Sequence, residues 1–246
     1  MDSDGWESVV QVKGIVVTKK VLPPPSHDGG DITAAAATAA ADNDGQPPIV
    51  DEAAAAKFAC VKAVATLNAR AEDLYALFLT NDRVHEFNEN CEGVEDLEYL
   101  TPTTKVTWAW TPRYGPFKAR DFVTVVNYRR LADGTFAVVN RPVDHPKVPR
   151  GGRFLRAEIL IASNLMRQNS KDSRLTDFVT IAHVNPGGIV DSALGAKIVN
   201  MLCAQAPVRL LQRLEAAANS PPRPRPGGGG GATAANGGSR EESAAS

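Results

Sequence analysis

The chain has 246 residues and a formal net charge of -1, which is room for one domain of ordinary size or two small ones. Hydrophobic residues make up 43% and charged residues 22%, a composition that excludes a wholly disordered chain. No apolar stretch approaches the ~18 residues of a membrane-spanning helix, and the N-terminus lacks the order of a secretory signal, so we expect a cytoplasmic protein. Cys60, Cys91 and Cys203 lie far apart without metal-binding spacing, and we expect all three to be reduced.

Hydrophobic periodicity predicts the elements of the central region in chain order. A strand over residues 57–67 precedes a short helix over 71–79, which Asn68 is expected to cap. Turn residues then separate six more predicted strands, over 94–100, 105–110, 120–130, 135–141, 153–162 and 175–184. Because consecutive strands have short links, we expect an antiparallel sheet. A long helix over 189–218, kinked at Pro207, follows the last strand.

A strongly curved antiparallel sheet with one long C-terminal helix across it is an α+β grip. If the helix does not fill the concave face, an apolar cavity remains between the two. The sequence therefore predicts a binding cavity as well as a fold class.

Two segments differ in composition from this region. Residues 22–56 hold 11 Ala, 5 Pro and 3 Gly, and residues 220–246 hold 7 Gly and 4 Pro. Neither can bury enough apolar surface to offset the entropy of ordering. We therefore expect one domain over 6–218, with a low-complexity insertion at 22–56 and a disordered tail over 219–246.

Several strings resemble those of a known family when taken in chain order. They are Trp6 followed by Gly14-Ile-Val-Val, then Gly115-Pro-Phe-Lys-Ala-Arg-Asp-Phe-Val, then Phe154-Leu-Arg-Ala after a His-Pro loop, and finally Asn185-Pro-Gly-Gly-Ile. This series resembles START domains (steroidogenic-acute-regulatory-related lipid transfer). The resemblance spans residues 6–218, interrupted by the Ala/Pro/Gly insertion, and the few residues before Trp6 leave an N-terminal helix in doubt.

The resemblance implies a helix-grip fold that holds one lipid between the sheet and the last helix, with no catalytic residue, metal or cofactor. The expected function is non-enzymatic binding and intermembrane transfer of a single lipid by a monomer. A lipid-sensing scaffold is the alternative, and a helix-grip cyclase or hydrolase is a more distant one. The four histidines lack metal-binding spacing, and the sequence has no Gly-x-Ser-x-Gly elbow.

Strand alternation and the resemblance together predict which residues contact the lipid. Alternation along 120–126 places four side chains on one face. In phospholipid-carrying members the arginine of the Arg-Asp pair contacts the polar part of the lipid, and here it is Arg120, although a structural ion pair at the sheet edge is an equal alternative. The expected lipid contacts are Arg120, Phe122, Thr124, Val126, Trp108, Trp110, Ile198, Met201, Leu202 and Gln205. Trp108 and Trp110 share a face at period two, which suits either an aromatic wall around the ligand or ordinary packing.

The lipid class can be narrowed by a missing charge pair. Sterol-carrying family members are expected to bury an arginine six residues beyond that of the Arg-Asp pair, with an acid on the neighbouring strand. Here the position is Val126, and no Asp or Glu lies between Glu98 and Asp121. A phospholipid-like ligand is therefore favoured over the sterol charged-pair mode.

Basic residues are concentrated between Arg113 and Arg174, where 13 Lys/Arg face 5 Asp/Glu. The cations near the His-Pro loop would attract an anionic membrane, with ~1 kcal/mol for each cation near the surface. A solvated surface is the alternative, whereas nucleic-acid binding is not expected because an aromatic platform is missing. The expected membrane-facing residues of this transient, peripheral contact are Arg141, Lys147, Arg150 and Arg153.

Overall fold

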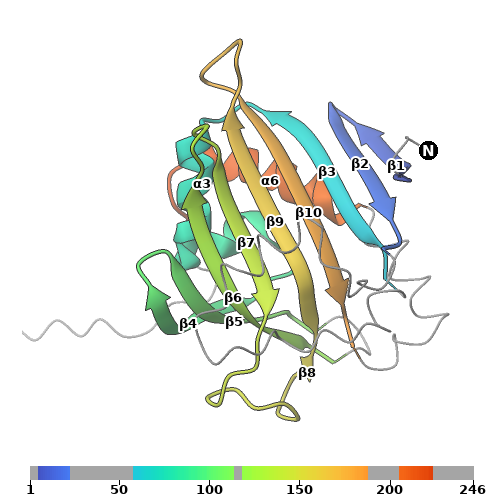
Figure 1. The fold of residues 1–246 in the computed structure, drawn as a ribbon, viewed down its shortest axis with the longest axis vertical. Coiled ribbons are helices and arrows are strands. Elements are labelled where there is room, and N and C mark those ends of the chain that lie inside the picture. The colour runs from blue at the N-terminus through green and yellow to red at the C-terminus, as the bar shows by residue number, and fades with distance from the viewer. Residues whose placement is uncertain (1–4, 23–57, 114–117, 188–204, 224–246) are drawn as a thin grey trace, which may run out of the picture.

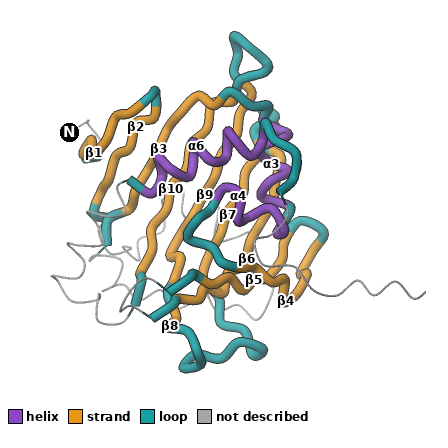
Figure 2. The backbone as a smooth tube through the Cα atoms, turned by 180° about the vertical axis from the view of Figure 1, so that it is seen from behind, coloured by secondary structure: helices purple, strands orange, loops and turns teal. Residues whose placement is uncertain are grey.

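The computed structural model describes residues 5–22, 58–113, 118–187 and 205–223. In this part of the chain a ten-stranded curved sheet carries its helices on one face (Figure 1). Seen from behind, helix α6 (Ala206–Ala218) crosses the strands, with α3 (Ala71–Leu79) and α4 (Val84–Phe87) beside it (Figure 2). The predicted α+β helix-grip class is confirmed.

The strands follow one another antiparallel across the sheet in the order β1-β2-β3-β10-β9-β7-β6-β5-β4, and the short β8 pairs parallel with β6. Their bounds are β1 (Glu7–Val12), β2 (Ile15–Lys20), β3 (Cys60–Leu67), β4 (Gly93–Thr101), β5 (Thr104–Trp110), β6 (Arg120–Arg130), β7 (Phe136–Pro142), β8 (Leu155–Arg156), β9 (Glu158–Gln168) and β10 (Thr176–Asn185). The pairing of β3 with β10 joins the two ends of the domain.

The core fills one half of the concave face. Leu211 and Leu214 of α6 are fully buried, as are Leu74 and Leu77 of α3, and all four belong to one apolar cluster with residues of the sheet. Along β10 the cluster includes Phe178 but not the next inward positions. Among the described residues, the helices therefore pack a core on only one half of the concave face.

The C-terminal end of α6 is fixed by a charged clamp from the segment between α3 and α4. Arg83, in the 3-10 turn η1 (Asn81–Arg83), donates from Nη2 to the carbonyls of Ala217 and Ser220, at 2.8 and 3.2 Å. The Glu86 carboxylate accepts two hydrogen bonds from the same guanidinium. Because α6 ends at Ala218, the clamp satisfies carbonyls that have no partner inside the helix.

The predicted elements agree with the structure in most places. The helix over 71–79 and the strand over 120–130 have the predicted bounds. The predicted strand over 153–162 is instead two strands, β8 and β9, separated at Ala157, and β9 runs on to Gln168. Strand β1 was not predicted and occupies residues 7–12.

The predicted cap of α3 is wrong. Arg70 occupies the N-cap position, without a side-chain hydrogen bond to the helix. Asn68 instead joins α3 to α6, because its N–H donates to Glu215 at 2.8 Å and its carbonyl accepts from Asn219 at 2.7 Å.

The long helix predicted over 189–218 is described only in its last part, as α6. Residues 188–204 lie outside the described residues, as do most of the insertion and the tail beyond Arg223. Pro207 stands in the first turn of α6, where a missing N–H removes no intrahelical bond, so the predicted kink is not tested.

Candidate functional site: a cavity on the concave face

The half of the concave face that the core leaves open holds a cavity of about 400 Å³. Strands β5, β6, β7, β9 and β10 form its floor, and α3, η1, α4 and the following loop form its other wall. A second space of about 200 Å³ adjoins it beneath the start of α6 and shares six of its lining residues. Pockets for small ligands occupy ~300–1,000 Å³, so the larger space alone reaches this range.

Space for the cavity arises where inward positions along β9 and β10 change from large to small or polar residues. On β10 the inward residue Phe178 belongs to the core, whereas Thr180 and Ala182 line the cavity. On β9 the change is from Met166 to Asn164 and Ala162. The smaller side chains of β9 and β10 lie side by side on adjacent strands, and together they leave the space of the cavity.

All the described residues that line the two spaces are uncharged, and most are apolar. The apolar lining of the larger space includes Leu77, Phe78, Val84, Phe87, Val94, Ala109, Phe122, Val126, Val138, Ile159, Ala162, Ile181, Ala182, Val184 and Leu210. Removing an ion from water into such surroundings costs several kcal/mol unless the ion is paired. The described lining therefore suits an apolar or neutral group.

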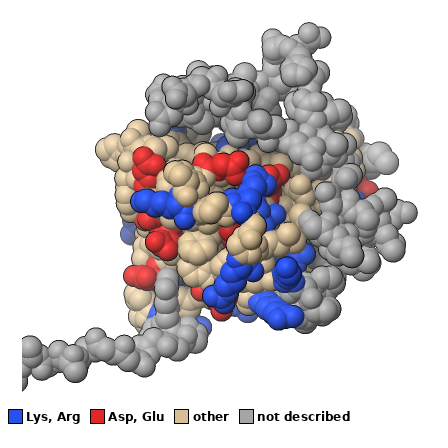
Figure 3. Space-filling model, turned by 90° about the horizontal axis from the view of Figure 1, so that it is seen from below, with Lys and Arg blue, Asp and Glu red and all other residues tan. Residues whose placement is uncertain are grey.

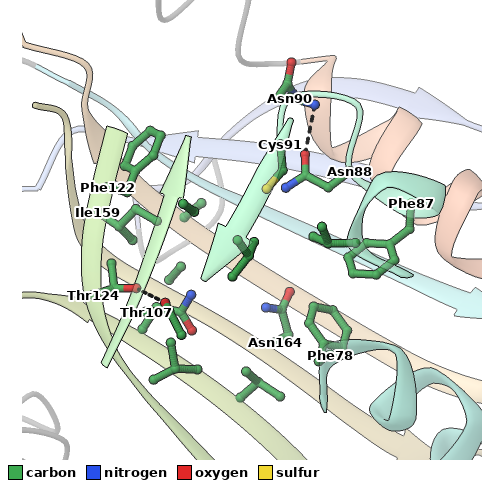
Figure 4. A pocket seen from close by; sticks show the side chains of 18 of the residues that line it. Phe78, Phe87, Asn88, Asn90, Cys91, Thr107, Phe122, Thr124, Ile159 and Asn164 are labelled. Atoms are coloured by element: carbon green, nitrogen blue, oxygen red, sulfur yellow. Dashed lines mark hydrogen bonds between the residues drawn. The ribbon is translucent and has the colours of Figure 1, made fainter. Parts of the chain in front are cut away.

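Polar side chains form a minority of the lining. The hydroxyls of Thr107 and Thr124 lie 3.1 Å apart and bond to each other across β5 and β6 (Figure 4). Asn140 and Asn164 also line the space, and the Oδ1 atom of each is buried without a hydrogen-bond partner. Tyr128 also lines the space, and burial raises the pKa of its phenol.

Three of the predicted contacts on β6 do line the cavity: Phe122, Thr124 and Val126. Trp110 lines it as well, with its ring across Gly93 of the neighbouring strand. A Cβ at Gly93 would lie 2.2 Å from that ring, so the glycine is what permits the ring to occupy this place.

Trp108 and Gln205, two further predicted contacts, are not among the described lining residues. Trp108 packs against the cluster of Leu97, Val106 and Val123, and its indole N–H donates to Asp121 at 3.1 Å. Gln205 is exposed at the start of α6 and is absent from the described lining. Ile198, Met201 and Leu202 lie outside the described residues.

Arg120 lies at the end of the row formed by Phe122, Thr124 and Val126, one alternate position beyond the lining. Its guanidinium donates to the carbonyl of Lys118 at 2.8 Å and approaches the carbonyl of Pro186 at 3.5 Å. Burial lowers the pKa of this group from its ordinary value. The arginine is thus held by backbone carbonyls at one end of the cavity.

The aspartate of the Arg-Asp pair points to the other face of the sheet. Asp121 accepts two hydrogen bonds from Arg156, both of 3.0 Å, in addition to the bond from Trp108. The Asp121 and Arg156 side chains are only 6% and 7% exposed. This buried ion pair joins β6 to β8 and fixes the base of the loop that precedes β8.

A family model for the START domain matches residues 41–218, which is more than half of the chain. The chain belongs to the START domain family. Membership indicates lipid binding and transfer as the general activity.

Solved structures of low sequence identity share the fold. Human StAR-related lipid transfer protein 5 is 19% identical, with a TM-score of 0.64, and the match covers 89% of this chain and 88% of that one. A STAR-related lipid transfer protein fragment from Xanthomonas axonopodis is 18% identical, with a TM-score of 0.61, over 88% of this chain and 100% of that one. No curated protein matches the sequence.

Val126, which stands where the resemblance leads us to expect the arginine of a sterol-carrying member, is buried and lines the cavity of this START domain. A different ion pair lies close by and was not predicted. Lys105, the register partner of Val126, is 6% exposed, and its Nζ lies 2.9 Å from the Asp96 carboxylate. Asn81 donates to the same carboxylate at 2.9 Å, so the pair fixes η1 against β4 and β5 beside the cavity.

The predicted membrane-facing residues lie at one end of the START domain, on or beside the loop between β7 and β8. Figure 3 views this end and shows several basic side chains gathered toward one side, with acidic and basic side chains mixed on the other. Arg150 bonds to both Asp144 and Glu158, which offset its charge. Arg141 is half-buried and donates to the Leu160 carbonyl.

Lys147 and Arg153 are exposed. The Lys147 ammonium donates to the carbonyl of Leu97 at 3.0 Å, and the Arg153 guanidinium lies over the Phe154 ring. Neither of these contacts neutralises the positive charge. Of the four predicted cations, these two best fit a surface that attracts anions.

Sequence reasoning missed several lining residues of this START domain, including Tyr128, Asn140 and Asn164. Tyr128 continues the alternation of the β6 row and could have been found by extending it. The asparagines occupy inward positions of β7 and β9, where the strand alternation otherwise places apolar residues. A polar residue in such a position could have indicated the cavity from the sequence.

Two further features of the described residues concern a membrane-spanning helix and a metal-binding cluster. No helix within the described ranges is long and apolar enough to span a membrane. In the same ranges, no group of three or more His, Cys, Asp or Glu side chains could hold a metal ion.

Proposed function

We propose that this START domain binds one lipid non-covalently in the concave-face cavity and, as a monomer, transfers it between membranes. The single observation that supports the proposal best is a cavity of about 400 Å³ whose described lining is apolar and neutral. Burial of an acyl or polycyclic group there contributes ~25 cal/mol for each Å² removed from water.

We further propose a phospholipid-like ligand, rather than a sterol held by a charged pair. Arg120 supports this assignment, because its guanidinium lies at the end of the lining row of β6 and can meet a phosphate or ester oxygen there. The uncharged interior would hold the acyl chains. Val126 supports it as well, since an apolar side chain occupies the position of the sterol-type arginine.

The end of the domain that carries Lys147 and Arg153 is the proposed membrane-facing surface. Contact with an anionic leaflet would be transient, because each exposed cation contributes only ~1 kcal/mol and salt weakens the attraction. The protein would then be cytoplasmic and peripheral on membranes.

Transfer of a labelled phosphatidylcholine between two vesicle populations tests the proposal. The expected result is transfer that increases with protein concentration, with the lipid recovered chemically unchanged. Chemically altered lipid would show an enzyme, and uptake without transfer would show a lipid sensor. Absence of both uptake and transfer by the folded protein would contradict the proposal.

A further inference from the structure

The sequence contains three hydroxyl residues that are followed directly by proline: Thr101, Thr111 and Ser220. Of these, only Ser220 has a basic residue three positions later, in the string Ser220-Pro-Pro-Arg223. Proline-directed protein kinases accept a serine or threonine before a proline, whose ring fixes the backbone and supplies no N–H. Many of these kinases also prefer a basic side chain at the third position after the hydroxyl residue. The sequence pattern therefore points to Ser220.

The structure separates the three hydroxyl groups in the same way. The Thr111 hydroxyl accepts a hydrogen bond from the N–H of Arg120 at 3.0 Å, at the start of β6. The Thr101 hydroxyl accepts one from the N–H of Thr103 at 3.2 Å, in the turn between β4 and β5. The described hydrogen bonds of Ser220 are made by its backbone, which leaves its hydroxyl available for reaction.

Ser220 lies where the chain leaves α6 and becomes accessible. The residue is half-buried, and residues 221–223 after it are exposed. Its backbone is held by long hydrogen bonds, because its N–H donates to Ala217 at 3.3 Å and its carbonyl accepts from Arg83 at 3.2 Å. Helix ends open locally at low cost, and a kinase binds its substrate as an extended segment. Opening of the last few residues is enough to present Ser220 to a kinase.

We propose that Ser220 is a phosphorylation site for a proline-directed protein kinase, and that phosphate there weakens the clamp between Arg83, Glu86 and the end of α6. In the reaction the Ser220 hydroxyl attacks the γ-phosphorus of ATP, and the bond from that phosphorus to the bridging oxygen breaks. ADP leaves, and the hydroxyl proton passes to the catalytic carboxylate of the kinase. The proposal does not depend on the proposed lipid-binding function.

The phosphate would enter a place that disfavours negative charge. It adds about −1.5 to −2 charge at the C-terminal end of α6, where the helix dipole is already negative. The Arg83 guanidinium beside Ser220 donates two hydrogen bonds to Glu86, whose side chain is only 2% exposed. A phosphate that repels Glu86, or that takes Arg83 from it, leaves a buried carboxylate with weaker pairing. Both events weaken the clamp.

Incubation of the full chain with a cyclin-dependent kinase and magnesium ATP tests the site, and tandem mass spectrometry locates the phosphate. We expect phosphate on Ser220, with Thr101 and Thr111 unmodified as internal controls. In Pro221→Ala and Arg223→Ala the kcat/KM of the kinase should be about tenfold lower, the effect of losing one favourable contact. Absence of phosphate on Ser220, or equal modification of either threonine, overturns the proposal.

Thermal melts measure the effect on the clamp. The phosphorylated chain should melt about 2–4 °C below the unmodified chain. In Arg83→Met, which lacks the clamp, phosphorylation should cause a much smaller shift, because the effect depends on groups in contact. Glu86→Gln gives the same comparison if Arg83→Met does not fold, and kinase-treated Ser220→Ala is the control for other sites. An unchanged melting temperature, or an equal shift in the clamp variants, overturns the proposed effect.

Discussion

At the scale of single residues, the side chains of Arg120 and Asp121 lie on opposite faces of the sheet. Because side chains alternate along β6, Arg120 shares the face of the cavity while Asp121 faces Trp108 and Arg156. We propose that Arg120 contacts the ligand, whereas Asp121 belongs to a structural ion pair. Substitutions at the two positions should therefore differ in kind.

Arg120→Met should weaken phospholipid uptake while the fold survives. A charge-assisted hydrogen bond to a phosphate or ester oxygen is worth ~1.5–3 kcal/mol, and methionine retains the apolar part of the side chain. Arg120→Lys should also be impaired if the contact is bidentate. Binding titrations and thermal melts decide the matter, and a variant that unfolds without a selective binding defect would assign Arg120 a structural role.

Arg156→Met should instead destabilise the protein by about 3–5 kcal/mol, because it leaves the Asp121 carboxylate buried and without its cation. Urea denaturation measures the change. Arg150→Met is the control, since its ion pairs are exposed and worth below about 1 kcal/mol. Equal losses in the two variants would show that the Asp121 pair contributes no more than a surface pair.

At the scale of elements, periodicity and turn residues predicted most of the strands and the helix α3. What they missed depends on contacts between distant segments. Asn68 resembles a cap in the local sequence, but Glu215 and Asn219 of the C-terminal region take its backbone groups. Likewise, alternation predicted the inward row of β6 but left Trp108 open between a ligand contact and ordinary packing, because the loop before β8 that packs with it is distant in sequence.

The clamp between η1, α4 and α6 should make stability depend on pH. The hydrogen bond from Arg83 lowers the pKa of the Glu86 carboxyl below its usual ~4.3. A lowered carboxyl pKa contributes stability that is present above the unfolded value and is lost as pH falls through the folded value.

The difference in melting temperature between the parent and Glu86→Gln should therefore be largest above about pH 5 and should shrink toward about pH 3. Thermal melts across this range measure it. A constant difference across the range would mean that ionisation of Glu86 does not stabilise the clamp.

At the scale of the whole molecule, domain organisation follows from composition. We propose that residues 6–218 form the domain and that the low-complexity segments are not needed for it. The first residues after α6 are an exception to the predicted tail, because the N–H of Arg223 donates to Glu86. The dispensable part of the tail should therefore begin after Arg223.

Deletion of residues 28–52 together with 224–246 should leave the melting temperature and lipid uptake nearly unchanged. Neither segment has the apolar content needed to pack on the fold. Thermal melts and lipid binding of the shortened chain check this. A fall of several degrees in the melting temperature would mean that at least one segment contributes to stability.

The proposed membrane surface predicts a transfer rate that depends on charge at one end of the molecule. Lys147→Glu/Arg153→Glu should slow transfer between anionic vesicles at low salt, and much less at high salt, where screening has already weakened the attraction. Lipid loading from detergent should be unchanged. Arg129→Glu/Arg130→Glu makes the same change of charge at the other end of β6, and an equal effect there would exclude a specific docking surface.

Native mass spectrometry of the purified protein counts the lipid molecules bound to each chain, so it tests directly whether this START domain holds one lipid in its cavity. We expect one lipid per chain in the parent protein. The variant Ala162→Phe, which fills the cavity floor, should lose the lipid while a thermal melt shows that it is folded. Folded parent protein without bound lipid after incubation with vesicles, or a variant that retains the lipid, would contradict this expectation.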